Sequence, residues 1–86
     1  MDKPIVSHGD KIWVGNIRAV VCQVFKDGNI EVVYYSGDDP RAINNGATWL
    51  NDHWEFIHSM GGGYADNNSR LANCVSILRQ GRQRYE

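Results

Sequence analysis

Apolar and polar residues alternate along most of the first two thirds of the chain, which is the period of strands with one buried face. The alternation predicts strands over residues 11–14, 17–25, 30–35, 42–44, 47–50 and 53–57. Pairs of residues that suit tight turns separate these strands, namely Gly15-Asn16, Asp27-Gly28, Asn45-Gly46 and Asn51-Asp52. Short strands at such regular spacing favour a small closed barrel or a sandwich, because closure removes exposed strand edges.

The hairpin around Asp27-Gly28 has the clearest pattern. Before the turn, Val20, Cys22 and Val24 form one apolar face of a strand rich in β-branched residues. After the turn, the alternation divides the strand into two faces: Ile30, Val32 and Tyr34 on one, and Glu31, Val33 and Tyr35 on the other. In the last strand Trp54 and Phe56 share a face, and we expect both rings in the core of so small a chain.

The pattern changes after residue 57. The stretch "MGGGYADNNS" predicts a flexible connection, because consecutive glycines lose too much backbone entropy inside a regular element. Beyond it, an apolar stripe at helical spacing predicts an amphipathic helix over residues 70–80; the stripe is Leu71, Cys74, Val75 and Leu78. Asn68 or Ser69 can cap this helix, and Gly81 is expected to end it. A helix this short is marginal alone, so it should dock on the barrel.

These elements amount to one mainly β domain of 86 residues. We expect a small SH3-like barrel of five or six short antiparallel strands over residues 1–60. Residues 61–86 would form a Gly-rich linker and one C-terminal α-helix packed on the barrel. Dimerisation would add burial to so short a chain, and a homodimer is compatible with the sequence.

Charge is distributed unevenly although the net charge is only −1. Residues 1–66 carry five Lys/Arg against nine Asp/Glu, and residues 67–86 carry four arginines against one Glu. The four arginines are Arg70, Arg79, Arg82 and Arg84. They suit contacts with nucleic-acid phosphates, and they equally suit the negative end of a helix dipole, which is the reading that the acidic body favours.

The two cysteines and the apolar runs bear on location. Cys22 and Cys74 each lie among apolar neighbours, which favours two buried free thiols in a reducing cytoplasm over a disulfide. The longest apolar run, "AVVC", is far shorter than a membrane span, and no secretory signal is visible. The sequence therefore predicts a cytoplasmic protein with no membrane association.

Two stretches carry a resemblance to known domains. "GDKIWVG" and "IRAVVCQVFKDGNIEVVYYSGD" resemble the opening strand and the central hairpin of SH3-like barrels of the Tudor and PWWP type, over roughly residues 9–57. The tail "GGGYADNNSRLANCVSILRQGR" is similar to the ends of short bacterial proteins, often from mobile elements, for which no activity is implied. The first resemblance implies the barrel fold and leaves the ligand open.

Tudor and PWWP domains hold methylated lysine or arginine in an aromatic cage. The loop that usually supplies one wall, Val14–Ile17 here, has no ring, and only Tyr35 beside Asp38 lies where the resemblance implies a cage residue. Trp49 is expected at the rim of the barrel, where Tyr35 and Trp13 could join it. The preferred hypothesis is an interaction module that binds a protein or peptide through this aromatic rim: Trp13, Tyr35, Asp38 and Trp49.

No pattern points to catalysis, a cofactor or a metal. His53 and His58 would lie on opposite faces of a strand, and no close pair of Cys or His ligands occurs. Plasmid-type dihydrofolate reductases build a pore enzyme from SH3-like barrels with a Val-Gln-Ile-Tyr motif, to which "CQVF" at 22–25 is a poor match. Nucleic-acid binding and a pore enzyme therefore remain the alternatives to the interaction module.

Overall fold

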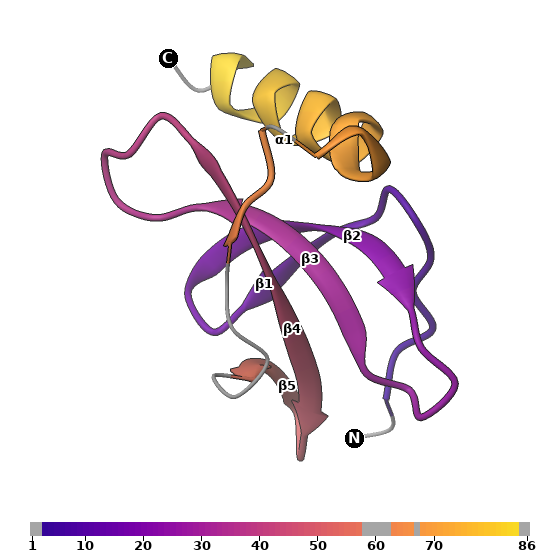
Figure 1. Ribbon diagram of the computed structural model, residues 1–86. Helices are drawn as coiled ribbons and strands as arrows, with labels where there is room; N and C mark the ends of the chain where they lie inside the picture. The colour runs from indigo at the N-terminus through magenta and orange to yellow at the C-terminus, as the bar shows by residue number, and fades with distance from the viewer. Residues whose placement is uncertain (1–2, 58–62, 67, 85–86) are drawn as a thin grey trace.

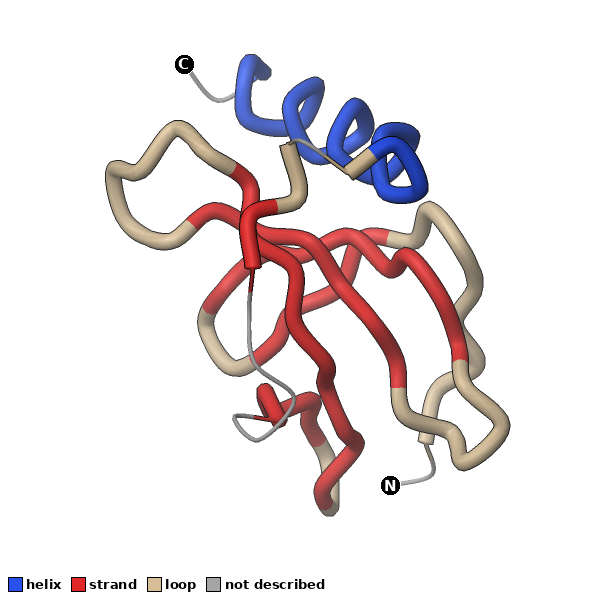
Figure 2. The backbone as a smooth tube through the Cα atoms, in the orientation of Figure 1, coloured by secondary structure: helices blue, strands red, loops and turns tan. Residues whose placement is uncertain are grey.

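The computed structural model describes residues 3–57, 63–66 and 68–84, with side chains described up to Gln80. It is mainly β, as predicted: five strands close into a barrel, and a sixth strand and one C-terminal helix are added to it (Figures 1 and 2). The elements are β1 (Lys11–Val14), β2 (Ile17–Val24), β3 (Ile30–Tyr35), β4 (Ala42–Leu50), β5 (His53–Ile57), β6 (Gly63–Tyr64), the 3₁₀ turn η2 (Ser69–Leu71) and α1 (Ala72–Arg84). This architecture is compatible with an SH3-like barrel.

Each strand pairs with the next one along the chain in antiparallel register. The barrel then closes through β1 and β5, which run parallel and meet at the single pair Val14 and Trp54. The predicted antiparallel arrangement is confirmed for the four consecutive pairs, and this closure adds one parallel pairing. An odd number of strands that each reverse direction leaves the first and last running the same way, so a parallel closure follows from the count.

The barrel interior is filled by alternate residues of all five strands. The buried members of this cluster are Val14, Ala19, Val21, Ile30, Val32, Tyr34, Ala47 and Trp54. The predicted face of β3 is confirmed, and so is the placement of Trp54, which packs beside the partly buried Phe56. The ring of Phe56 lies 4.6 Å from that of Tyr34, centroid to centroid.

A second apolar cluster lies outside the barrel, between its wall and α1. Its buried members are Val20, Val33, Ala42, Ala65, Leu71, Cys74, Val75 and Leu78. The predicted helical stripe is therefore confirmed, and so is its docking on the barrel, where α1 contacts β2 and β3. Asn68 caps the turn before the helix, because its side chain accepts a hydrogen bond from the Arg70 backbone N–H.

Three local predictions are wrong. Asn45-Gly46 makes no turn, because β4 runs unbroken through Gly46, which pairs with Glu31 on one side and Ile57 on the other. Gly81 does not end the helix, which continues to Arg84. The described part of the expected flexible connection is ordered, since β6 pairs with β4 and Ala65 is fully buried; residues 58–62 lie outside the described part.

The face predicted for β2 also needs correction. Val20 and Cys22 point toward the helix, but Val24 is 45% exposed and does not continue that face. The cause is a bulge between Val21 and Gln23, which inserts one residue and reverses the alternation beyond it. The helix therefore covers only the middle of β2.

Candidate functional site

The predicted aromatic rim does not form one surface. Tyr35 pairs with Ala42 at the start of β4, whereas Trp49 lies seven residues further along that strand, about 23 Å away. Tyr35 packs against the cluster under α1, and Asp38 is exposed in the loop that follows β3. Trp49 packs against the barrel interior, edge-on to Trp54 at 5.3 Å. Only Trp13 of the predicted set is a largely exposed ring.

Trp13 lies on an outer face of the barrel that α1 leaves uncovered. Its neighbours Ile12 and Val14 point inward, so the strand period directs Trp13 outward, where 58% of it is exposed. The two-residue turn at Gly15-Asn16 sets Arg18 directly opposite it on β2. The Arg18 guanidinium lies 5.2 Å from the centre of a Trp13 ring, within the range of a cation–π contact.

The row continues across the barrel closure onto β5 and β4. Val14 pairs with Trp54 in parallel register, so the residues one step earlier, Trp13 and His53, lie side by side on the outer face. His53 in turn pairs with Leu50, which is 45% exposed. Four strands thus present one row of outward side chains, Arg18, Trp13, His53 and Leu50. We call the outer surface of β1, β5 and the end of β4, with Arg18 at its border, the open face.

Two carboxylates hold the His53 ring within the open face. Its Nδ1 lies 2.9 Å from Asp52 Oδ1 and its Nε2 lies 2.8 Å from Glu55 Oε2. These hydrogen bonds, that of Asp52 first, raise the pKa of His53, and the same contact lowers the pKa of Asp52. Because both ring nitrogens are occupied, His53 is not poised as a free base. The group is better suited to recognition than to proton transfer.

Two of the four arginines that were predicted to contact nucleic acid form ion pairs within the chain. Arg70 forms a two-pronged ion pair with Glu31 of β3, at 2.7 and 3.0 Å, and Arg79 contacts Asp66 at 2.6 Å. Both arginines therefore fasten α1 to the barrel, and the Arg70 pair lowers the pKa of Glu31. Arg82 and Arg84 belong to α1, but their side chains lie outside the described part.

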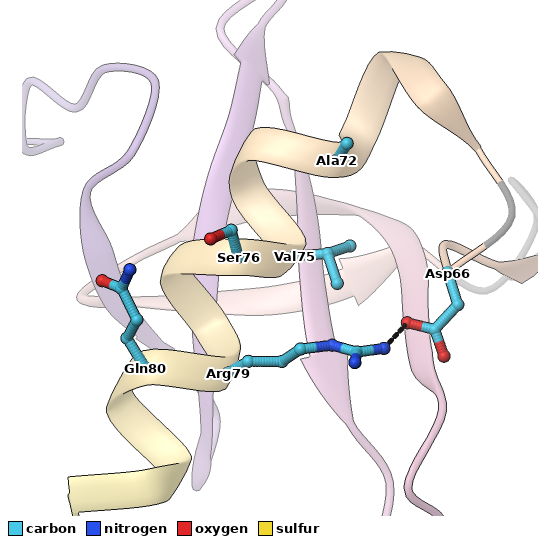
Figure 3. A pocket seen from close by; sticks show the side chains of 6 residues that line it. All are labelled: Asp66, Ala72, Val75, Ser76, Arg79 and Gln80. Carbon is cyan, nitrogen blue, oxygen red and sulfur yellow. Dashed lines mark hydrogen bonds and ion pairs between the residues drawn. The ribbon is translucent and has the colours of Figure 1, made fainter.

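An open hollow of about 440 Å³ lies along α1 beside the Arg79–Asp66 ion pair. Figure 3 shows Arg79 reaching from the helix toward Asp66, with Ala72, Val75, Ser76 and Gln80 along the same stretch. The charges of Arg79 and Asp66 at this hollow neutralise each other, and the rest of its lining carries no charge. Nothing in its chemistry selects a ligand.

The two cysteines, far apart in sequence, meet under the helix. Cys22 is half-buried and Cys74 is fully buried, and both thiols are free, as the sequence predicted. Burial raises the pKa of Cys22 and of Cys74, which keeps both as neutral thiols. His8 contacts Cys74 Sγ at 3.7 Å, and its Nδ1–H donates a hydrogen bond to the Cys22 carbonyl oxygen, 2.9 Å away. This cluster joins the N-terminal arm, β2 and α1.

Sequence reasoning missed Arg18, Leu50 and His53 as parts of one surface. The position of Arg18 could have been predicted from the sequence, because a two-residue turn at Gly15-Asn16 places Arg18 opposite Trp13. The other two depend on the register of the β1–β5 closure, which joins segments distant in the chain. No local pattern contains that register.

Comparison of the chain with protein-family models, with curated proteins and with solved structures found no match. Across residues 3–57, 63–66 and 68–84, no helix has both the length and the apolar character needed to cross a bilayer. In the same part of the chain, no three His, Cys, Asp or Glu side chains are grouped so that they could hold a metal ion. His58, which the sequence places on the strand face opposite His53, lies outside the described residues.

Proposed function

We propose that this protein is a non-catalytic interaction module that binds another protein or peptide through the open face. The observation that carries the proposal is the exposed Trp13 ring, set in a row with Arg18 and Leu50 on a wall that α1 leaves bare. Tryptophan and arginine are the residues most enriched among those that dominate binding energy at protein interfaces. Exposing this much aromatic surface in a small monomer has no benefit for folding.

The resemblance of residues 9–57 to SH3-like barrels of the Tudor and PWWP type supports the same class of function. The surface differs from the one such domains use, however, because Tyr35 packs toward α1 and Trp13 stands on a different wall. We therefore do not propose recognition of a methylated side chain. We also do not propose nucleic-acid binding, because Arg70 is paired with Glu31 of the barrel and Arg79 with Asp66 of the segment after β6.

The half-buried and buried free thiols support a reducing compartment, and we propose the cytoplasm as the place of action. A bacterial origin and a link to mobile elements rest on the resemblance of the tail alone. Neither is needed for the proposed binding surface.

Site-specific photo-crosslinking in the native host tests the function. A benzophenone-bearing residue replaces Leu50, beside Trp13, and in a control replaces Tyr64, which is similarly exposed (49%) but lies at the other end of β4. Tyr64 is matched in chemistry as well, since the Arg41 guanidinium stacks 3.8 Å from its ring. We expect a cross-linked adduct from position 50 that disappears with Trp13→Ala. Equal adducts from both positions, or none from position 50, would refute the open face as a binding surface.

A further inference from the structure

Charged side chains divide the open face into two halves. On the β1–β2 side are Lys11 and Arg18, both exposed. On the β5 side are Asp52 and Glu55, also exposed, with His53 between them. The exposed ring of Trp13 lies near the boundary of the two halves. One half is therefore basic, the other is acidic, and apolar surface joins them.

Among residues whose side chains the structure describes, Lys11 and Arg18 have no carboxylate partner, unlike the other arginines of that part of the chain. Arg41, Arg70 and Arg79 each form an ion pair within the chain. No ion pair to Lys11 or Arg18 is formed by any residue that the structure describes, and Arg18 contacts only the Trp13 ring. Across the boundary, two carboxylates share the single imidazole of His53. The basic half therefore has cations without carboxylate partners among the described residues, and the acidic half has one more carboxylate than it has cations.

We infer that the open face binds the open face of a second copy of this chain, forming a symmetric dimer. This inference rests on the proposed function and names its partner. Consider a two-fold axis that lies in the interface, parallel to the strands and between β1 and β5. Such an axis exchanges the two halves, so Lys11 of each copy meets the Asn51–Asp52 turn of the other, and Arg18 lies across from Leu50, at the edge of the half that carries Asp52 and Glu55. The axis perpendicular to the strands would instead set like charges together, so the charge pattern selects one arrangement.

The apolar part of the face fits the same arrangement. Trp13 and His53 are neighbours on either side of the axis, so the Trp13 ring of one copy would lie against His53 of the second copy. A ring packed in this way is the kind of central contact that dominates an interface. The face spans only a few short strands, which puts the interface at the small end of the known range. We therefore expect a weak dimer that forms and dissociates with concentration.

Sedimentation equilibrium of the purified chain over a wide concentration range tests this. The wild type should show reversible monomer–dimer association, and Trp13→Ala should weaken it by about tenfold or more. Tyr64→Ala is the matched control and should leave it unchanged. A wild type that stays monomeric at the highest attainable concentration would overturn the inference, as would undiminished association of Trp13→Ala.

Two charge-reversed variants test whether the copies are related by the proposed axis. One variant carries Lys11→Glu and Arg18→Glu, and the other carries Asp52→Lys and Glu55→Lys. Each alone should dimerise about tenfold or more weakly than wild type, whereas an equimolar mixture should regain association as a heterodimer. Circular dichroism confirms that both are folded, since all four positions are exposed. A mixture that associates no better than its components overturns the arrangement.

The outcome is distinguishable from failure of the proposed function. If the purified protein is monomeric but position 50 cross-links to a different protein in a Trp13-dependent way, the dimer is wrong and the interaction module stands. If position 50 gives no adduct, the proposed function fails with it. An adduct of twice the chain mass supports both.

Discussion

The barrel has two outer faces of contrasting character, one covered by the chain itself and one bare. Figure 1 shows α1 lying over one side of the barrel. Under α1, the wall presents small and β-branched residues such as Val20 and Val33, and its charged residue Glu31 is paired with Arg70. On the open face the wall presents Trp13 and Leu50, and its cations have no carboxylate partner among the described residues. Apolar side chains on the outer face of a sheet are stabilised when another element or molecule covers them. The chain supplies its own cover for the first face, and we propose that a second molecule supplies it for the other.

The largest expected effect is on the free energy of unfolding, which should depend strongly on which of the two faces loses a leucine side chain. Leu71 is 1% exposed and packs between the helix and the barrel wall, whereas Leu50 is 45% exposed on the open face. Leu71→Ala should lower the free energy of unfolding by about 2–5 kcal/mol, because it removes buried methyl groups and leaves a cavity. Leu50→Ala, the same chemical change, should alter it by less than about 0.5 kcal/mol. Urea denaturation at low protein concentration measures both, and equal losses would contradict the contrast.

A smaller effect is expected from the ion pair under the helix. The Arg70 guanidinium lowers the pKa of Glu31, so the ionised carboxylate stabilises the fold. This stabilisation is complete above the ordinary pKa of a Glu side chain and is lost as the pH falls through the lowered pKa of the folded state. Glu31→Gln should therefore cost about 1 kcal/mol near neutral pH. Its difference from wild type should shrink toward zero in acid.

Unfolding titrations at several pH values measure the Glu31 contribution. Asp39→Asn is the control, since Asp39 also has a pKa lowered by an arginine, Arg41, but lies on a loop outside the helix interface. That more exposed pair should contribute little. A Glu31→Gln penalty that persists unchanged at low pH would show that the ion pair is not its source.

On the open face, Trp13→Ala should barely change the stability of the monomer. More than half of the ring is exposed, and its chief described contact is the Arg18 guanidinium. We expect a change of less than about 1 kcal/mol in the free energy of unfolding, measured at a concentration where the chain is monomeric. A large loss would mean that Trp13 serves the fold, and the reason to assign it to binding would disappear.

The smallest effect is a shift in a titration. Hydrogen bonds from His53 to Asp52 and Glu55 raise the pKa of its imidazole, so the ring should remain protonated above the ordinary pKa of about 6.5. Proton NMR of the ring protons measures this directly. Asp52→Asn should lower the pKa of His53 toward its ordinary value, and Glu55→Gln should do so as well. An unchanged titration in both variants would show that the carboxylates do not hold the ring in solution.

Local patterns predicted the elements whose residues are neighbours in sequence. The β2–β3 hairpin, the two faces of β3 and the stripe from Leu71 to Leu78 all depend on spacing within a single segment, and all are confirmed. The turn expected at Asn45-Gly46 was wrong for a reason outside its segment. Gly46 is fully buried between strands on both sides of β4, so the position selects a small residue without needing a reversal.

The candidate site was predicted only in part for the same reason. Trp13 was expected to join Trp49 and Tyr35 at the rim, and its ring is exposed. Nothing near Trp49 told whether its own ring faces the interior or the rim. The structure settles this through Trp54, which packs edge-on against Trp49 inside the barrel. Likewise, the arginines of the tail read as free charges until β3 supplies Glu31 and the segment after β6 supplies Asp66. In each case, the orientation or charge pairing of the side chain depends on a residue that is distant in sequence.

The parallel closure of the barrel has a consequence for how the chain folds. The other four strand pairs of the barrel join strands that are consecutive in the chain, whereas Val14 and Trp54 must find each other across forty residues and then share a single pairing. Contacts that close so long a loop form late and carry a large entropic cost. The antiparallel pairs β1 to β5 should therefore form first, and the β1–β5 pair should close the barrel last. The Gly15 amide donates to the Trp54 carbonyl oxygen across this closure. Its hydrogen exchange in the native state should therefore be faster than that of the β3 amides.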